Sequence, residues 1–309
     1  MPLDKHKVVF ILGPTAIGKT SLAVKLAKKI KGEIISCDSM QVYRGVNILS
    51  QAPSPKDTGS VPHHLVRSVS PLDEFSAAQF AKRARTLIKD IIRRGKVPIV
   101  AGGSGLYAKA LIDGLFPSPE ARPVFRKKMC ALAARYGSAY IYEKLRKIDK
   151  DAARLIHKND ARRIIRALEI WHTTGKTMTE LKKNTRGISA TYDLKIFGLT
   201  ADRETIYSNI NDRVENMLKA GALREVKRLY KKDLSKTARL MIGLRELTGF
   251  LNGEYDLEAA AELMKRNTRR FAKRQLTWFK ADKRIKWLDV SSLRADKVSE
   301  AILKEIASG

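Results

Sequence analysis

The stretch GPTAIGKT, residues 13–20, decides the fold. It follows a short apolar run at residues 8–12 and precedes a segment in which Leu22, Leu26 and Ile30 recur at helical spacing. A strand, a glycine-rich loop and a helix in this order are the structural context of a phosphate-binding P-loop. Small residues let backbone N–H groups converge on a phosphate, Lys19 adds a full charge, and Thr20 can bind Mg²⁺. We therefore expect a diphosphate-binding loop formed by Gly13, Pro14, Thr15, Ala16, Ile17, Gly18, Lys19 and Thr20, with Mg²⁺ as the cofactor.

Apolar runs and helical patterns alternate on either side of this loop. Residues 33–37, 97–100 and 193–200 have the composition of buried strands, and apolar residues between 80 and 91 line one face of a helix. Such alternation predicts an α/β fold with a parallel sheet. We expect residues 1–118 and 191–309 to form this core, the latter ending in a basic helical part. After a proline-rich stretch, residues 119–190 show helical patterning alone, which predicts an inserted helical domain.

The charge balance points to a polyanionic partner. The chain has 61 Lys and Arg against 32 Asp and Glu, a formal net charge of +29 and a sequence pI of about 10.2. The expected insertion contributes 18 basic and 7 acidic residues. A surface of solvated lysines would explain the charge without a ligand, so the position of the charges has to decide.

Composition also excludes several classes of protein. Cys37 and Cys130 are too few for a disulfide framework or a cysteine-rich zinc site. No stretch approaches the length needed to span a bilayer. We expect a soluble, cytoplasmic protein without membrane association that acts as a monomer.

The P-loop by itself indicates a diphosphate or a triphosphate, and most such loops serve ATP or GTP chemistry. An ATPase usually carries an acidic Mg²⁺ partner at the end of an apolar strand. Here the strand at 97–100 ends in AGGSGLY, and the comparable acid is Asp38, which follows the strand at 33–37. The carboxyl edge of the sheet would bring Asp38 beside the P-loop.

Six separated motifs carry a family resemblance. They are GPTAIGKT at 13–20, DSMQVYR at 38–44, HHL at 63–65, AGGSGLY at 101–107, RRIIRALEIWHTTGK at 162–176 and KRQLTWF at 273–279. In this order, over roughly residues 8–280, they closely resemble the tRNA dimethylallyltransferase (IPP transferase) family. The resemblance implies a P-loop kinase-like core that binds dimethylallyl diphosphate and does not consume ATP. It implies transfer of the prenyl group to N6 of the adenosine immediately 3′ of the anticodon, in the tRNA anticodon stem-loop.

The resemblance assigns Asp38 the role of general base, which removes a proton from a poorly nucleophilic adenine amine. A Mg²⁺ ligand or a helix cap is the other interpretation of this carboxylate. Lys19, Thr15 and an arginine would stabilise the leaving diphosphate. Arg213 resembles that arginine, and Arg203 is the alternative.

The expected tRNA contacts come from three regions. Asp38 to Gln41 and Ser104 lie near the acceptor, and the insertion and residues 261–280 supply basic side chains. The tRNA-binding residues we expect are Asp38, Ser39, Met40, Gln41, Ser104, Arg162, Arg163, Ile164, Ile165, Arg166, Lys273, Arg274, Gln275 and Trp278. Between 261 and 280, two rows of four-residue spacing, 265–269–273 and 266–270–274, predict a broad basic stripe on one helix for phosphate contact. Trp278 could equally be a core residue.

Some features leave alternatives open. His63 and His64 suggest structural or substrate-positioning roles rather than a zinc site. Residues 48–53, ILSQAP, replace the usual family sequence IGTAKP, Ser104 replaces a threonine, and Arg162 replaces a glutamine. Prenylation of free AMP, ADP or ATP, a P-loop kinase or NTPase, and a non-catalytic RNA-binding protein remain the competing functions. The insertion could swing as a lid or be rigidly docked.

Overall fold

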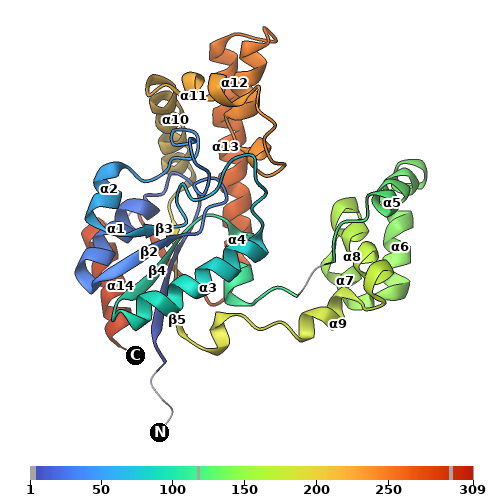
Figure 1. Cartoon of the computed structure of the whole chain (residues 1–309), viewed down its shortest axis with the longest axis horizontal. Helices are drawn as coiled ribbons and strands as arrows, with labels where there is room; N and C mark the ends of the chain where they lie inside the picture. Colours follow the sequence, from blue (N-terminus) through green and yellow to red (C-terminus); the bar gives the residue numbers. More distant parts are fainter. Residues whose placement is uncertain (1–4, 117–118, 292–294, 309) are drawn as a thin grey trace. The chain divides into compact units, whose positions relative to one another are not determined.

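The computed structural model describes residues 5–116, 119–291 and 295–308 and divides the chain into two compact units (Figure 1). Unit 1 comprises residues 1–112 and 188–309, and unit 2 comprises residues 113–187. The expected insertion at 119–190 therefore overlaps unit 2, although the division falls a few residues earlier at both ends.

A six-stranded parallel sheet forms the centre of unit 1, in the order β3-β2-β4-β1-β5-β6. Its strands are β1 (Lys7–Leu12), β2 (Gly32–Ser36), β3 (His63–His64), β4 (Val97–Gly102), β5 (Asp193–Thr200) and β6 (Lys286–Asp289). The expected α/β fold is confirmed, and the apolar runs that predicted strands became β1, β2, β4 and β5. The edge strands β3 and β6 carry no pattern that predicts them, because they have only 2 and 4 residues.

Side chains of alternate residues of β1 pack into two separate hydrophobic cores, one on each face of the sheet. Val8, Phe10 and Leu12 pack on one face with the buried side of α3 (Ala77–Arg93) and α4 (Gly105–Ile112). Val9 and Ile11 pack on the other face with α1 (Lys19–Ile30) and α14 (Ala295–Ala307). Both faces of a parallel sheet are thus covered by helices, which explains why its strands are continuous apolar runs rather than alternating ones.

Further helices of unit 1 lie in the connections from β2 to β3 and from β5 to β6. They are α2 (Pro55–Ser60), α10 (Arg203–Lys219), α11 (Ala222–Leu229), α12 (Leu244–Leu251) and α13 (Leu257–Lys280), with short 3-10 turns at Ile188–Ala190 and Ala238–Leu240. The longest of them, α13, packs against α10 and α12 (Figure 1). Within the described ranges, no helix is both long enough and apolar enough to cross a bilayer.

Unit 2 is built from helices alone. They are α5 (Pro123–Tyr136), α6 (Ser138–Ile148), α7 (Lys150–Leu155), α8 (Ala161–Thr174) and α9 (Met178–Lys183). Its own core contains Ile141, Leu145, Ile164 and Leu168, all fully or almost fully buried. A separate core of this kind allows the unit to be stable in its own right.

Candidate active site

The P-loop connects the end of β1 to the start of α1. Gly18 is the N-cap residue of α1 with a φ of 84°, and no side chain caps the helix. The first N–H groups of the helix are therefore available to an anion, and the helix dipole adds positive potential there. The conformation favours glycine because a side chain is strained at this φ.

Lys19 projects back across the loop. Its Nζ donates a hydrogen bond to the carbonyl oxygen of Pro14 at 2.5 Å. Burial, and after it the Arg213 guanidinium, lower the pKa of Lys19 to about 7, and the Asp38 carboxylate opposes both effects. The two cations repel each other, so this site favours a negatively charged ligand in addition to Asp38.

Helix α10 brings Arg213 to the same loop. Its guanidinium donates to Oγ1 of Thr15 at 2.9 Å, and burial lowers the pKa of Arg213 while Asp38 raises it. Arg203, the alternative from the same helix, instead lies over the ring of Tyr207, 4.9 Å from its centroid. The structure therefore places Arg213, and not Arg203, at the P-loop.

Asp38 follows the last residues of β2 at the same edge of the sheet. Its Oδ1 accepts the backbone N–H groups of Met40 at 2.8 Å and Gln41 at 3.3 Å. Its Oδ2 has no hydrogen bond among the described residues. One oxygen thus fixes the loop and the other is open. The neighbouring Cys37 is buried, and burial raises the pKa of its thiol, so it is a neutral group beside the site.

The loop after β4 is joined to the Asp38 segment by Ser104. Its backbone N–H donates to the carbonyl of Cys37 at 3.1 Å, and its hydroxyl accepts from the Ser39 N–H at 3.0 Å. Gln41 is also held internally, since it accepts from Ser36 Oγ at 2.8 Å and donates to the carbonyl of Gln51 at 3.0 Å. Ser39, Gln41 and Ser104 therefore form a pre-organised frame around Asp38.

The last turns of α13 present the expected tRNA-binding residues in two groups. Lys273, Arg274 and Trp278 are exposed, and the indole of Trp278 covers Gly105, where an added Cβ would lie 2.3 Å from the ring. Gln275, by contrast, is buried and bonded to backbone groups of unit 1. Its amide is turned away from solvent, so the expected base-edge contact does not fit this conformation.

The basic stripe on α13 is narrower than the sequence predicts. Lys265 forms ion pairs with Glu215 at 2.7 Å and Glu262 at 2.8 Å, and Arg269 donates to Asn211 at 2.8 Å. These two cations are engaged within the protein because that edge of α13 packs on α10. Exposed charge remains at Lys273, which ends this row, and along the other row at Arg266, Arg270 and Arg274.

In unit 2, the expected tRNA-binding residues of α8 divide in a similar way. Arg162 and Arg163 are exposed, whereas Ile164 and Ile165 are buried in the core of the unit. Arg166 forms an ion pair with the fully buried Glu169 and donates to the carbonyl of Pro119 at 3.0 Å. Arg126 also binds Glu169, and these contacts lower the pKa of Glu169 to about 2 against the effect of burial. The isoleucines and Arg166 thus stabilise the unit.

The two histidines are held within the protein. His64 pairs with the buried Glu33 at 2.8 Å, which Arg94 also binds, and Nδ1 of His63 lies 2.8 Å from the carbonyl of Val61. In the part of the chain that the structure describes, no cluster of three His, Cys, Asp or Glu could hold a metal ion. Structural roles fit both histidines.

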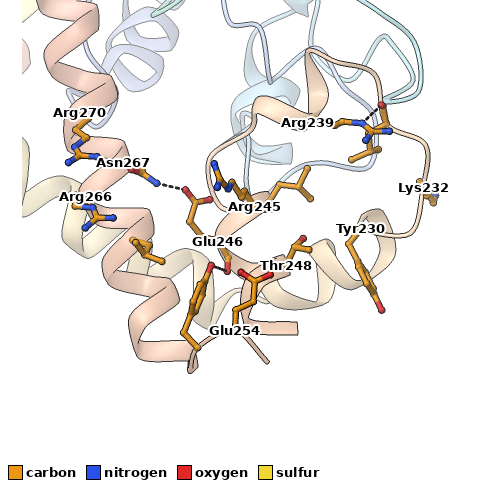
Figure 2. Close-up of a pocket in the computed structure, with 15 residues that line it drawn as sticks. Tyr230, Lys232, Arg239, Arg245, Glu246, Thr248, Glu254, Arg266, Asn267 and Arg270 are labelled. Carbon is orange, nitrogen blue, oxygen red and sulfur yellow. Dashed lines mark hydrogen bonds between the residues drawn. The ribbon is translucent and has the colours of Figure 1, made fainter. Parts of the chain in front are cut away.

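Sequence reasoning missed a basic cavity of about 730 Å³ between α12, α13 and the segment 230–239 that follows α11 (Figure 2). Arg266 and Arg270 of α13 line it together with Arg239, Arg245 and Lys232. Figure 2 shows the hydrogen bond from Asn267 to Glu246, at 2.6 Å, that ties α13 to α12 beside the cavity. The sequence contains only a weak indication of this cavity, because the basic residues of the stretch 239–245 follow neither a helical nor a strand periodicity.

Comparison with known proteins gives a consistent result. The sequence model of the IPP transferase family matches residues 41–282. The tRNA dimethylallyltransferase of Halothermothrix orenii is 47% identical over 305 residues, covering 97% of this chain and 93% of the relative. That of Bacillus subtilis is 43% identical over 290 residues, covering 93% and 92%.

Solved structures are similar over nearly the whole chain. The tRNA isopentenylpyrophosphate transferase of Bacillus halodurans has a TM-score of 0.73 and 40% identity, covering 98% of this chain and 96% of that one. A eukaryotic dimethylallyltransferase acting on tRNA has a TM-score of 0.76 and 31% identity, covering 98% and 80%.

Proposed function

This chain belongs to the IPP transferase family, and we propose that it transfers the dimethylallyl group of dimethylallyl diphosphate to tRNA. The acceptor is N6 of the adenosine immediately 3′ of the anticodon, and the products are N6-dimethylallyladenosine and diphosphate. One observation carries the proposal beyond family membership. A carboxylate with an open oxygen, Asp38, shares its site with the cations Lys19 and Arg213 of the anion-binding loop.

On the donor side, the C–O bond to the diphosphate breaks and its electron pair leaves with the diphosphate. Negative charge therefore increases on the leaving group as the reaction proceeds. Lys19, Arg213 and the free N–H groups of the P-loop stabilise that charge more in the transition state than in the ground state. The Thr15 hydroxyl, which accepts from Arg213, orients the guanidinium toward the loop.

Thr20 fits a role in holding Mg²⁺. Its hydroxyl has no hydrogen bond within the described ranges, and Mg²⁺ usually takes a few protein oxygens and completes its shell with phosphate oxygens and waters. A bound Mg²⁺ would neutralise part of the diphosphate charge.

On the acceptor side, the new bond forms between N6 and the allylic carbon, and the N6 proton passes to Oδ2 of Asp38. The amine is a weak nucleophile, so proton removal during attack lowers the barrier. A base stacked in an anticodon loop cannot approach the donor in line, which requires the adenosine to be flipped out.

Exposed cations of both units would hold the anticodon stem-loop. Lys273 and Arg274 of α13 and Arg162 of α8 suit phosphate contacts, and the exposed Trp278 suits stacking on a base. Nothing in this arrangement requires a second copy of the chain, and we propose that the protein acts as a monomer.

The test compares acceptors with labelled dimethylallyl diphosphate and Mg²⁺. We expect label in tRNA, little label in AMP, and none in a matched tRNA with guanosine in place of the adenosine 3′ of the anticodon. Label in AMP but not in tRNA would indicate an adenylate prenyltransferase. ATP hydrolysis or phosphoryl transfer without prenylation would indicate a kinase or NTPase, and tRNA binding without any transfer an RNA-binding protein.

A further inference from the structure

Gln275 joins the two loops that end the central strands of the sheet. Its Oε1 accepts the backbone N–H of Thr15 at 2.8 Å, in the loop after β1. Its Nε2 donates to the carbonyl of Gly103 at 2.9 Å, in the loop after β4. Gln275 is 6% exposed, and its two partners are 260 and 172 residues away in sequence.

This contact restricts which amides can bind the diphosphate. The N–H of Thr15 points to Gln275, and Pro14 has no N–H, so neither backbone nitrogen can donate to a phosphate. The N–H groups of residues 16–20 remain for the ligand. Gln275 thus sets the conformation of the P-loop at the residue that also orients Arg213.

The fit around Gln275 leaves little freedom. A Cβ added to Gly103 would lie 2.2 Å from Nε2, so a side chain at 103 would displace the amide. One turn later on α13, Trp278 covers Gly105, the first residue of α4 after the same loop. The inward face of the last turns of α13 is therefore fixed to both loops, while Lys273 and Arg274 on its outward face are exposed.

We propose that Gln275 is a positioning residue that couples tRNA contact on the outer face of α13 to the conformation of the diphosphate-binding loop. The coupling rests on the proposed function, because it requires tRNA to bind Lys273 and Arg274. A shift of these turns moves Gln275 and, with it, Thr15 and Gly103. Coupling between two sites is reciprocal, so tRNA strengthens diphosphate binding by the same factor as diphosphate strengthens tRNA binding.

The experiment measures binding of inorganic diphosphate with Mg²⁺ by calorimetry, with and without saturating tRNA. In the wild-type protein we expect tRNA to tighten diphosphate binding. Gln275→Met keeps the length of the side chain and removes both hydrogen bonds. It should weaken diphosphate binding by about tenfold or more, because a buried N–H and a buried carbonyl lose their partners, and it should abolish the effect of tRNA. Affinity for tRNA alone should change by less than about twofold.

Thr277→Val is the matched control, since the exposed Thr277 hydroxyl bonds only within its own helix, to the carbonyl of Lys273. It should bind diphosphate as the wild type does. If Gln275→Met does not fold, Gln275→Glu serves instead, because it keeps an acceptor for Thr15 and loses the donor to Gly103. We expect the same loss of coupling from it.

Three results would overturn the proposal. Diphosphate affinity could be independent of tRNA in the wild type, Gln275→Met could retain the full tRNA effect, or its defect could lie in tRNA affinity alone, as for a direct RNA contact. Binding of inorganic diphosphate does not depend on prenylation, so a failure of the proposed function is detected separately. Wild-type protein that binds diphosphate and tRNA with coupling, yet transfers no label, refutes the activity while supporting the role of Gln275.

Discussion

At the scale of single residues, the two carboxylate oxygens of Asp38 have different roles, one structural and one chemical. Its Oδ1 holds the loop through the N–H groups of Met40 and Gln41, and asparagine can keep both contacts. We expect Asp38→Asn to lower kcat by about 10²- to 10⁴-fold, because the open oxygen no longer accepts a proton. Diphosphate affinity, measured by calorimetry, should not fall, since the substitution removes a negative charge. Asp57→Asn, which alters the capping box of α2, is the control, and turnover of Asp38→Asn near the wild-type rate would remove the base assignment.

At the scale of elements, the two edges of α13 should behave differently toward salt. Arg270 and Arg274 are exposed, whereas Lys265 is already paired with Glu215 and Glu262. Reversing either arginine to glutamate should weaken tRNA binding and flatten its salt dependence, by about one or more in the slope of log K against log salt. Lys265→Gln should lower the unfolding temperature and leave that slope unchanged. Equal slopes for wild type and Arg274→Glu would assign the exposed row to solvent.

At the scale of the whole molecule, the two units have separate cores, and α4 contacts the 3-10 turn at Ile188–Ala190 where the chain returns to unit 1. A short Gly-Ser bridge replacing residues 113–187 should therefore leave unit 1 folded and able to bind diphosphate. If unit 2 acts as a lid that excludes water from the allylic carbon, prenylation at saturating tRNA should fall further than the loss of tRNA affinity explains. Circular dichroism, calorimetry and single-turnover rates check these points. A folded, donor-binding deletion protein that turns over at the intact rate would show that unit 2 is not a functional lid.

Local sequence determined the parallel core and the presence of a phosphate loop. Because helices cover both faces of the sheet, its strands need side chains that are mainly apolar on both sides. Continuous apolar runs of this kind are visible in the sequence, at residues 8–12, 33–37, 97–100 and 193–200. The position of Asp38 at the carboxyl edge also follows from sequence, since it comes directly after a strand. The two-residue β3 and the four-residue β6 could not be predicted from the sequence, because strands this short show no measurable periodicity of apolar residues.

Only the tertiary structure determined the interaction partner of each polar side chain. Arg203 and Arg213 lie on the same helix, and only the packing of α10 on the P-loop separates them. Gln275 lies in sequence among exposed cations, yet its side-chain amide points inward and bonds to Thr15 and Gly103, which are far away in sequence. The physical reason is that helix and strand periods report which face of an element is apolar. The partner of a buried amide or a paired lysine depends on contacts across the fold, which no local pattern records.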